Sequence, residues 1–255
     1  MKKQIQLCVL AFVSAIGVAS VQAQLQTNTA PAKAEWKSSV AAGLTLTRGN
    51  GETTLGTLTA ASHGKWDSRE LTIGADGAYG ESKTAGQTES TVTSELLHGF
   101  VQYNWLFTDR FYGLGRAEGL HDGVADIRYR ATFSVGAGYY LIKTTNTDLS
   151  AEVGPGYLFQ KLGDDTSDYA TLRFGEKFHQ ALSSHARLWQ SAEFLPQVRN
   201  FENYIVNAEI GIEADLRNDK KLALRSYITD TFNSEPALGR KQNDLTWVTA
   251  IAYKF

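Results

Sequence analysis

This sequence predicts an all-β fold, a transmembrane antiparallel up-and-down β-barrel of about 12 strands. Three observations carry the prediction. The chain begins with an export signal, apolar and polar residues alternate through most of the remainder, and the last residue is the aromatic Phe255. No apolar run of ~20 residues follows the signal, so a helical membrane protein is excluded.

The first 23 residues have the parts of a secretory signal peptide. Two lysines precede the apolar residues 7–18, and the small-x-small triplet 21–23 provides a cleavage site. A membrane anchor helix is less favoured, because the apolar run is shorter than the ~20 residues that a span needs. We therefore expect export and cleavage near Ala23, with residues 1–23 as the signal peptide.

Cleavage there changes the composition in two ways. It leaves 232 residues with 23 basic and 27 acidic side chains, a net charge of −4. It also removes Cys8, the only cysteine, so the mature chain has no disulfide and no cysteine metal site. The mild negative charge gives no footprint for nucleic acid. Residues 24–35 form a short polar linker, and the barrel is expected over 36–255.

The alternation of apolar and polar residues is clearest in residues 204–216, YIVNAEIGIEADL. One parity reads Tyr-Val-Ala-Ile-Ile-Ala-Leu, and the other includes Glu209, Glu213 and Asp215. Successive side chains of a strand point to opposite faces, so one face is apolar and the other acidic. A helix would scatter both sets around its axis. The pattern returns in residues 127–142, 149–160 and 247–255.

Aromatic residues near both ends of the apolar faces distinguish a membrane barrel from a secreted β-sandwich, the alternative reading. Tyr129 and Tyr139 flank one strand, and Trp247 and Tyr253 another. Outer-membrane barrels have such aromatic girdles at the two membrane interfaces, with apolar residues facing out and polar residues facing in. Because no open sheet edge is tolerated in lipid, the sheet must close.

Turn signals divide the chain into twelve strands. Their ranges are 36–48, 53–66, 69–82, 90–106, 110–120, 126–142, 147–161, 168–181, 186–198, 202–216, 221–233 and 243–255. Pro155 within one of them marks a bulge or a local break. Tight turns alternate with connections that are mostly longer or richer in glycine and charge. An even strand count places both termini in the periplasm, where such barrels have their short turns.

The last strand explains the aromatic end of the chain. Trp247, Ile251, Tyr253 and Phe255 share its apolar face, which we expect to face lipid, while its backbone pairs with the first strand. Outer-membrane barrels generally end in such a strand, and the barrel assembly machinery recognises the terminal aromatic. The alternative is a soluble strand that happens to end in phenylalanine.

Parity also predicts which side chains face the lumen. The inward set is Lys37, His63, Lys65, Asp76, His98, Arg128, Arg130, Glu152, Arg173, Lys177, His179, Arg187, Glu193, Glu209, Glu213, Arg225 and Lys254. We expect Arg128, Arg130, Glu152, Glu209, Glu213 and Arg225 to line a narrow pore and to set its ion preference. The alternative is a filled interior where opposite charges on neighbouring strands neutralise each other. Barrels of about eight strands are filled and those of sixteen to eighteen are open. Abundant inward glycine and alanine tilts the expectation slightly to a pore.

No short motif points strongly to chemistry. RGNGETT at 48–54 is better explained as a hairpin turn than as a phosphate cradle, because no helix N-terminus follows. The carboxylates of GDDTSD at 163–168 could hold Ca²⁺ or bridge Mg²⁺ to lipopolysaccharide, but an exposed loop is favoured. HDGVAD at 121–126 has the same explanation. The five histidines form no HxH or HxxxH pair, and no serine lies in a nucleophile motif. We expect no catalytic residue, no metal and no cofactor.

The sequence resembles a family of outer-membrane proteins described as salt-induced, whose domain has no assigned function in Gram-negative bacteria. The resemblance runs from about residue 36 to 255. It is carried by GLTLTRGNGETTLGTLTAASHGKW, YGLGRAEGLHD, VGAGYYLIKTTNTDLSAEVGPGYLFQ and the terminal AIAYKF. The resemblance implies an outer-membrane barrel linked to salt response, and it supplies no enzymatic activity, ligand or site residue.

Two functions from different classes follow from these expectations. The first is a narrow passive channel for ions or small solutes. The second is a closed barrel that supports the envelope or interacts at its surface, and a surface hydrolase is a remote third. The expected partners are outer-membrane lipid and lipopolysaccharide, together with the barrel assembly machinery during insertion.

Overall fold

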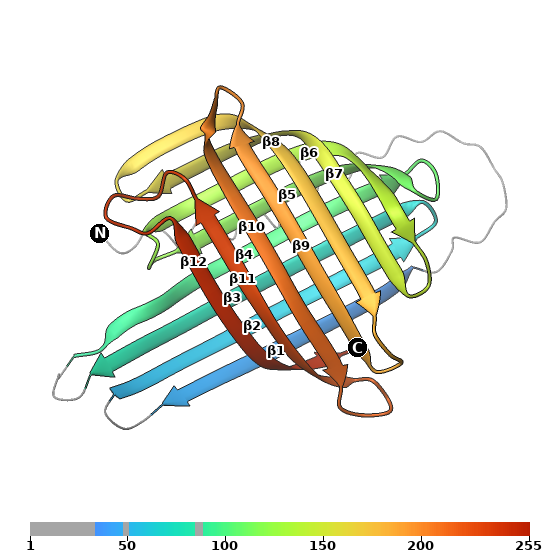
Figure 1. The fold of residues 1–255 in the computed structure, drawn as a ribbon, viewed down its shortest axis with the longest axis horizontal. Coiled ribbons are helices and arrows are strands. Elements are labelled where there is room, and N and C mark those ends of the chain that lie inside the picture. The colour runs from blue at the N-terminus through green and yellow to red at the C-terminus, as the bar shows by residue number, and fades with distance from the viewer. Residues whose placement is uncertain (1–33, 48–50, 85–88) are drawn as a thin grey trace. The chain divides into compact units, whose positions relative to one another are not determined.

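The structure is a computed structural model that describes residues 34–47, 51–84 and 89–255. Twelve strands make one closed antiparallel barrel in which each strand pairs with its neighbours in sequence and β12 returns to β1 (Figure 1). The strands are β1 (Glu35–Thr47), β2 (Gly51–Trp66), β3 (Arg69–Thr84), β4 (Thr91–Leu106), β5 (Phe111–Asp122), β6 (Ile127–Lys143), β7 (Thr147–Leu162), β8 (Asp165–Ala181), β9 (Ala186–Gln197), β10 (Asn200–Asp215), β11 (Leu222–Asn233) and β12 (Asn243–Lys254). The predicted fold class and the count of twelve are confirmed.

β1 begins and β12 ends at the same end of the barrel, which we call the terminal end; the opposite end is the loop end. The expectation of mostly longer connections at the loop end holds only in part. β11 and β12 are joined there by residues 234–242, but β7–β8 and β9–β10 are joined by the two-residue turns 163–164 and 198–199. The reason is that β8 and β10 begin earlier than expected, so residues assigned to loops extend the sheet.

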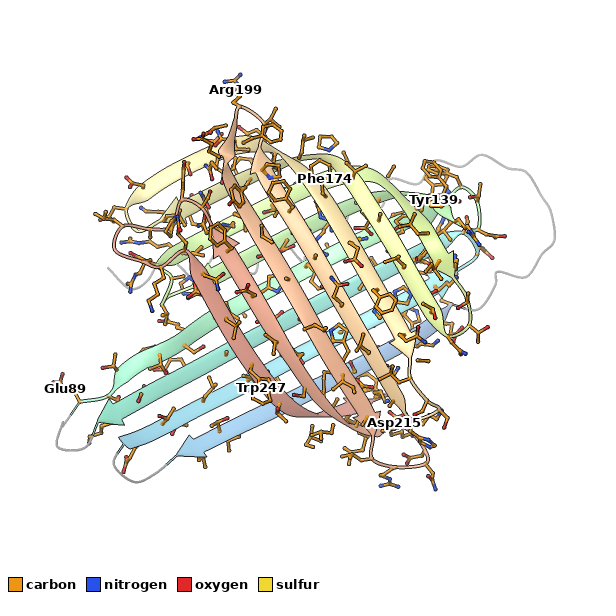
Figure 2. The ribbon with its side chains drawn as sticks, in the orientation of Figure 1. Glu89, Tyr139, Phe174, Arg199, Asp215 and Trp247 are labelled. Atoms are coloured by element: carbon orange, nitrogen blue, oxygen red, sulfur yellow. The ribbon has the colours of Figure 1, made fainter. Side chains whose placement is uncertain are left out.

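The outer face of the barrel is apolar and has an aromatic band near each end, as the lipid-facing wall of a transmembrane barrel requires. Trp36 and Trp66 stack at the terminal end with ring centroids 6.2 Å apart. Tyr204 and Phe232 stack at the loop end at 5.6 Å. Figure 2 labels Tyr139, Phe174 and Trp247, which are also 42–70% exposed. These exposed aromatic residues are explained by contact with lipid at its interfaces with water.

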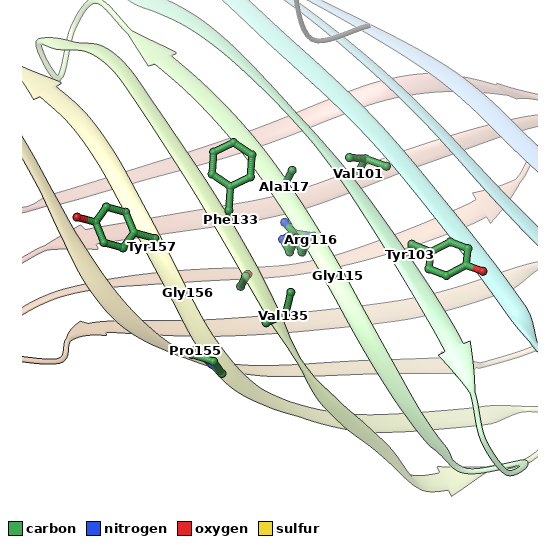
Figure 3. Close-up of a pocket in the computed structure, with 11 residues that line it drawn as sticks. Val101, Tyr103, Gly115, Arg116, Ala117, Phe133, Val135, Pro155, Gly156 and Tyr157 are labelled. Atoms are coloured by element: carbon green, nitrogen blue, oxygen red, sulfur yellow. The ribbon is translucent and has the colours of Figure 1, made fainter. Parts of the chain in front are cut away.

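One part of the outer wall is hollowed because small residues lie between large ones. Gly115 and Ala117 on β5 lie beside Tyr103 on β4 and Phe133 on β6, and this groove has a volume of about 520 Å³ (Figure 3). A side-chain carbon added at Gly115 would meet nothing within 4 Å. The groove is open and faces the same side as the aromatic bands, so lipid covers it.

Pro155 interrupts the pairing of β6 with β7, as the sequence predicts. Pairs are formed at Ser134–Gly156 and at Ala137–Val153 but not between them, and the register is the same on both sides of the gap. Proline has no N–H to donate to the ladder. A side-chain carbon on Gly136 or Gly154 would overlap the backbone of the facing strand. The two strands therefore approach closely at a break that only glycine accommodates.

Several inward glycines accommodate an aromatic ring of the facing residue. Gly74 lies opposite Phe100, Gly138 opposite Tyr112, and Gly211 opposite Trp189. In each pair, a side-chain carbon on the glycine would overlap the ring. Inward glycine was expected to leave empty space in the lumen. At these three positions the space holds a neighbouring aromatic ring instead.

Candidate functional site

Polar side chains from β4, β5, β7 and β8 meet inside the barrel around one carboxylate, that of Glu152. Glu152 Oε1 accepts hydrogen bonds from Gln102 Nε2 at 2.9 Å, from the Tyr112 hydroxyl at 2.9 Å and from Lys177 Nζ at 3.2 Å. Its other oxygen accepts from Arg173 Nη1 at 2.8 Å. We call these five residues the waist network. Four donors on one carboxylate fix its position firmly.

The waist network crosses the lumen rather than following the wall. β4 and β8 are four strands apart in the barrel, yet Lys177 Nζ donates to Gln102 Oε1 at 2.9 Å. Glu70 on β3 and Tyr140 on β6 are joined in the same way at 3.1 Å. Side chains of strands that lie three or four places apart in the sheet can meet only through the interior. The barrel is therefore narrowed at this level.

A second chain of contacts continues from the waist network. Arg116 on β5 donates to Gln102 and to Glu118, and its Nε lies 4.0 Å from Glu193 on β9. Glu118 in turn faces one ring nitrogen of His98 at 3.0 Å, and Asp76 faces the other at 2.7 Å. Acidic and basic groups thus alternate from β3 to β9.

Water-sized space remains beside these charges. The side chain of Lys177 is 33% exposed and that of Asp76 is 35% exposed, although both point inward. Glu152 and Arg173, by contrast, are almost fully covered. The network is therefore dense on the β7–β8 wall and bordered by accessible space elsewhere.

A separate charged cluster follows the wall nearer the terminal end. Glu213 on β10 accepts from Arg225 on β11 at 2.7 Å, from Lys254 on β12 at 3.0 Å and from Arg187 on β9 at 2.8 Å. Arg225 also donates to the Ser39 hydroxyl of β1 at 3.4 Å. These contacts join neighbouring strands or strands with a single strand between them, so they cover the wall without crossing the lumen.

The remaining residues singled out from the sequence occupy different places. Arg130 is buried and its Nε donates to Gln160 on the neighbouring strand β7 at 2.9 Å. Glu209 accepts from Trp189 Nε1 at 2.5 Å. Arg128 is half exposed and pairs with Asp164 of the β7–β8 turn at 2.9 Å. Arg128 therefore lies at the rim of the loop end.

Sequence reasoning missed Gln102, Tyr112, Arg116 and Glu118. All four share the inward parity with His98 and Glu152, but they were not selected. Gln102 and Tyr112 carry no charge, and Arg116 and Glu118 belong to a glycine-rich strand whose outward face has little apolar signal. For Gln102, the even spacing from His98 along β4 was the available signal.

The four aromatic or apolar residues of the final strand lie on its outer face. Trp247, Ile251, Tyr253 and Phe255 are 46–70% exposed. The backbone of Phe255 exchanges hydrogen bonds of 3.0 and 3.1 Å with Ser38 of β1. The end of the chain is thereby attached to the first strand, with its aromatic ring directed outward.

The other motifs contribute no further site. Residues 48–50 of RGNGETT lie outside the described residues. Asp165 and Asp168 belong to β8, where Asp168 accepts from the Tyr157 hydroxyl at 2.5 Å. Within the described ranges, no group of three or more His, Cys, Asp or Glu side chains could hold a metal ion. The same ranges contain no helix long and apolar enough to cross a membrane.

Comparison with known proteins identifies the family. Residues 40–255 match the family model described as "Protein of unknown function, DUF481", and the chain belongs to that family. No curated protein matches the sequence. The translocator domain of the autotransporter NalP from Neisseria meningitidis is similar in structure, with 17% identity, 89% of this chain and 90% of that chain covered, and a TM-score of 0.42. The NanC porin has 9% identity, 86% and 96% coverage and a TM-score of 0.47.

Proposed function

We propose that this protein is a narrow passive channel for ions and small polar solutes, and that the waist network forms its constriction. One observation carries the proposal. Glu152 and Lys177 both reach Gln102 across the lumen, yet Lys177 remains one-third exposed to water-sized space. A polar constriction with accessible space beside it is the arrangement by which a pore admits small solutes and selects among ions.

A closed barrel is the second candidate, and specific observations favour it too. The contacts between β4 and β8 narrow the interior, and three inward glycines hold aromatic rings instead of leaving space. If side chains and ordered water fill the remaining space in the lumen, the barrel would not conduct, and its function would depend on its outer surface. Such a barrel would support the envelope or contact partners through its loop end.

The proposal includes a location and partners. After export and cleavage near Ala23, the assembly machinery would recognise the final strand with Phe255 and insert the barrel into the outer membrane. The terminal end would face the periplasm, and lipid and lipopolysaccharide would surround the wall. The proposal assigns no catalytic role, no cofactor and no contact with nucleic acid. The family resemblance adds a role under salt stress, to be tested by growth of a deletion strain in high salt.

Single-channel recording distinguishes the two candidates. The purified mature protein is inserted into a planar bilayer, and folding is checked by its heat-dependent mobility on a gel. Discrete conductance steps are the expected result. A folded, inserted barrel that passes no current would overturn the channel and favour the closed barrel.

A further inference from the structure

The seam between β1 and β12 is closed over only part of its length. β1 pairs with β2 from Glu35 to Thr47, but it pairs with β12 only from Ser39 to Ala42, opposite Ile251 to Lys254. β12 pairs with β11 from Asn243 onward. Gly43 still lies against β12, because a side-chain carbon on it would overlap the Thr249 carbonyl. Beyond it, within the described strands, the facing edges of residues 44–47 and 243–248 have no strand partner. Figure 1 shows β1 and β2 running away from β12 on that side.

This opening lies toward the loop end and within the lipid-facing belt. The outer side chains on its two edges are among the most exposed apolar residues of the barrel: Leu44 69% and Leu46 61% on β1, and Leu245 65% and Trp247 70% on β12. Unpaired backbone groups are not tolerated in hydrocarbon. Something other than lipid tails alone must therefore contact these edges.

The inner wall beside the opening is uncharged from β1 to β4. Here a row means the inward residues that face one another across β1, β2, β3 and β4. The two rows nearest to the opening are Gly43, Thr57, Ala78 and Leu96, and then Thr45, Leu55, Gly80 and Ser94. The next row toward the terminal end is Ala41, Thr59, Asp76 and His98, where the charged network begins. This uncharged stretch of small, hydroxyl and aliphatic side chains is bordered by the charged network on the side of the waist, and by Asp122 on β5 and Asp244 on β12.

We propose that the unpaired half of the β1–β12 seam is a lateral opening that admits the acyl chain of a lipid-like amphiphile from the outer leaflet into the lumen. The acyl chain fits the apolar lips and the uncharged rows, and a polar head group would reach the unpaired backbone edges and the row of Asp76 and His98. This inference goes beyond the proposed channel function and does not depend on it, because the opening lies on the loop-end side of the waist network.

Quenching by brominated lipid tests acyl-chain access. A bimane label is attached to Val248→Cys, an inward position on the unpaired stretch of β12, in a Cys8→Ser chain. The matched control is Thr229→Cys, an inward position on β11 that is paired on both sides with Glu209 and Thr246. In vesicles of dibrominated phosphatidylcholine, we expect several-fold more quenching at 248 than at 229. Equal, weak quenching at both would overturn the proposal.

A pair of cysteines tests the opening itself. If the seam continued its register, Thr45 would face Val248, as Ala41 faces Ala252. Oxidation should therefore join Ala41→Cys with Ala252→Cys but leave Thr45→Cys and Val248→Cys unjoined, because a disulfide needs Cα atoms within about 7 Å. Equal joining of both pairs would show a closed seam. Dimers formed through Thr45→Cys and Val248→Cys would assign the edge to a second copy and also overturn the proposal.

Discussion

The ammonium group of Lys177 on β8 donates a 2.9 Å hydrogen bond to the side-chain oxygen of Gln102 on β4, across the interior of the barrel. The same ammonium group contacts Glu152 on β7 at 3.2 Å. One basic group thus joins two separated parts of the wall. Its partial exposure places it where a solute would meet it.

Removal of the central carboxylate should destabilise the barrel. Glu152→Ala leaves the nearly buried Arg173 with one carboxylate fewer, and breaking a buried ion pair costs about 3–5 kcal/mol. The free energy of unfolding is measured by urea titration in lipid vesicles. Arg128→Ala is the control, because it removes an exposed ion pair at the rim and should change stability by less than about 1 kcal/mol. Equal effects would contradict the central position of Glu152.

Lumen charge should set ion preference. Glu209→Gln combined with Glu213→Gln removes two inward carboxylates, so the cation preference of a conducting barrel should fall. Reversal potentials in a salt gradient measure this change. Glu176→Gln is the control, because Glu176 bonds to Gln190 on the outer face and should have no effect. An unchanged preference in the double variant would remove both residues from the conduction path.

The tyrosine at the waist depends on the glycine that it covers. Gly138→Val should push the Tyr112 ring away from Glu152 and cost about 1–3 kcal/mol through overpacking. Adding Tyr112→Ala should cancel much of that cost in a double-mutant cycle. Gly115→Ala, which meets nothing within 4 Å, should stay within about 0.5 kcal/mol of the native protein. Strict additivity of the first two substitutions would show that the ring and the glycine are independent.

The terminal aromatic residue should matter for assembly more than for the folded barrel. Phe255→Ala is expected to lower the yield of protein in the outer membrane. The same substitution at Phe201, another exposed aromatic residue, should leave the yield nearly unchanged. Quantitative gels of membrane fractions measure both. Similar losses for the two variants would mean that the final position has no special role.

Alternation was sufficient to predict the fold class and the twelve strands, because membrane strands must separate apolar from polar residues at every second position. Parity also placed Glu152 and Lys177 on the same face as Arg225. It could not show that Lys177 reaches Gln102, because that contact depends on how far the closed sheet is sheared. Parity also could not show that the Tyr112 ring lies over Gly138, because the register between two strands cannot be predicted from the sequence of either strand alone.

The point at which β1 stops pairing with β12 could not be predicted from the sequence either. The prediction that the last strand pairs with the first is correct for Ser38 to Ala42, while Leu44 to Thr47 have no pairing with β12. Both stretches alternate regularly, so the pattern gives no sign of where pairing ends. The end of pairing is a property of the whole barrel and of the angle between its edges.

Chemical modification of the waist tests the central claim most directly. Lys177→Cys in a Cys8→Ser chain is recorded in a planar bilayer before and after addition of a bulky, negatively charged thiol reagent. If the waist network is the constriction of an open lumen, discrete conductance steps will be seen first and will fall sharply after modification. Steps that persist unchanged after complete modification, or a folded barrel that never conducts, would contradict the claim.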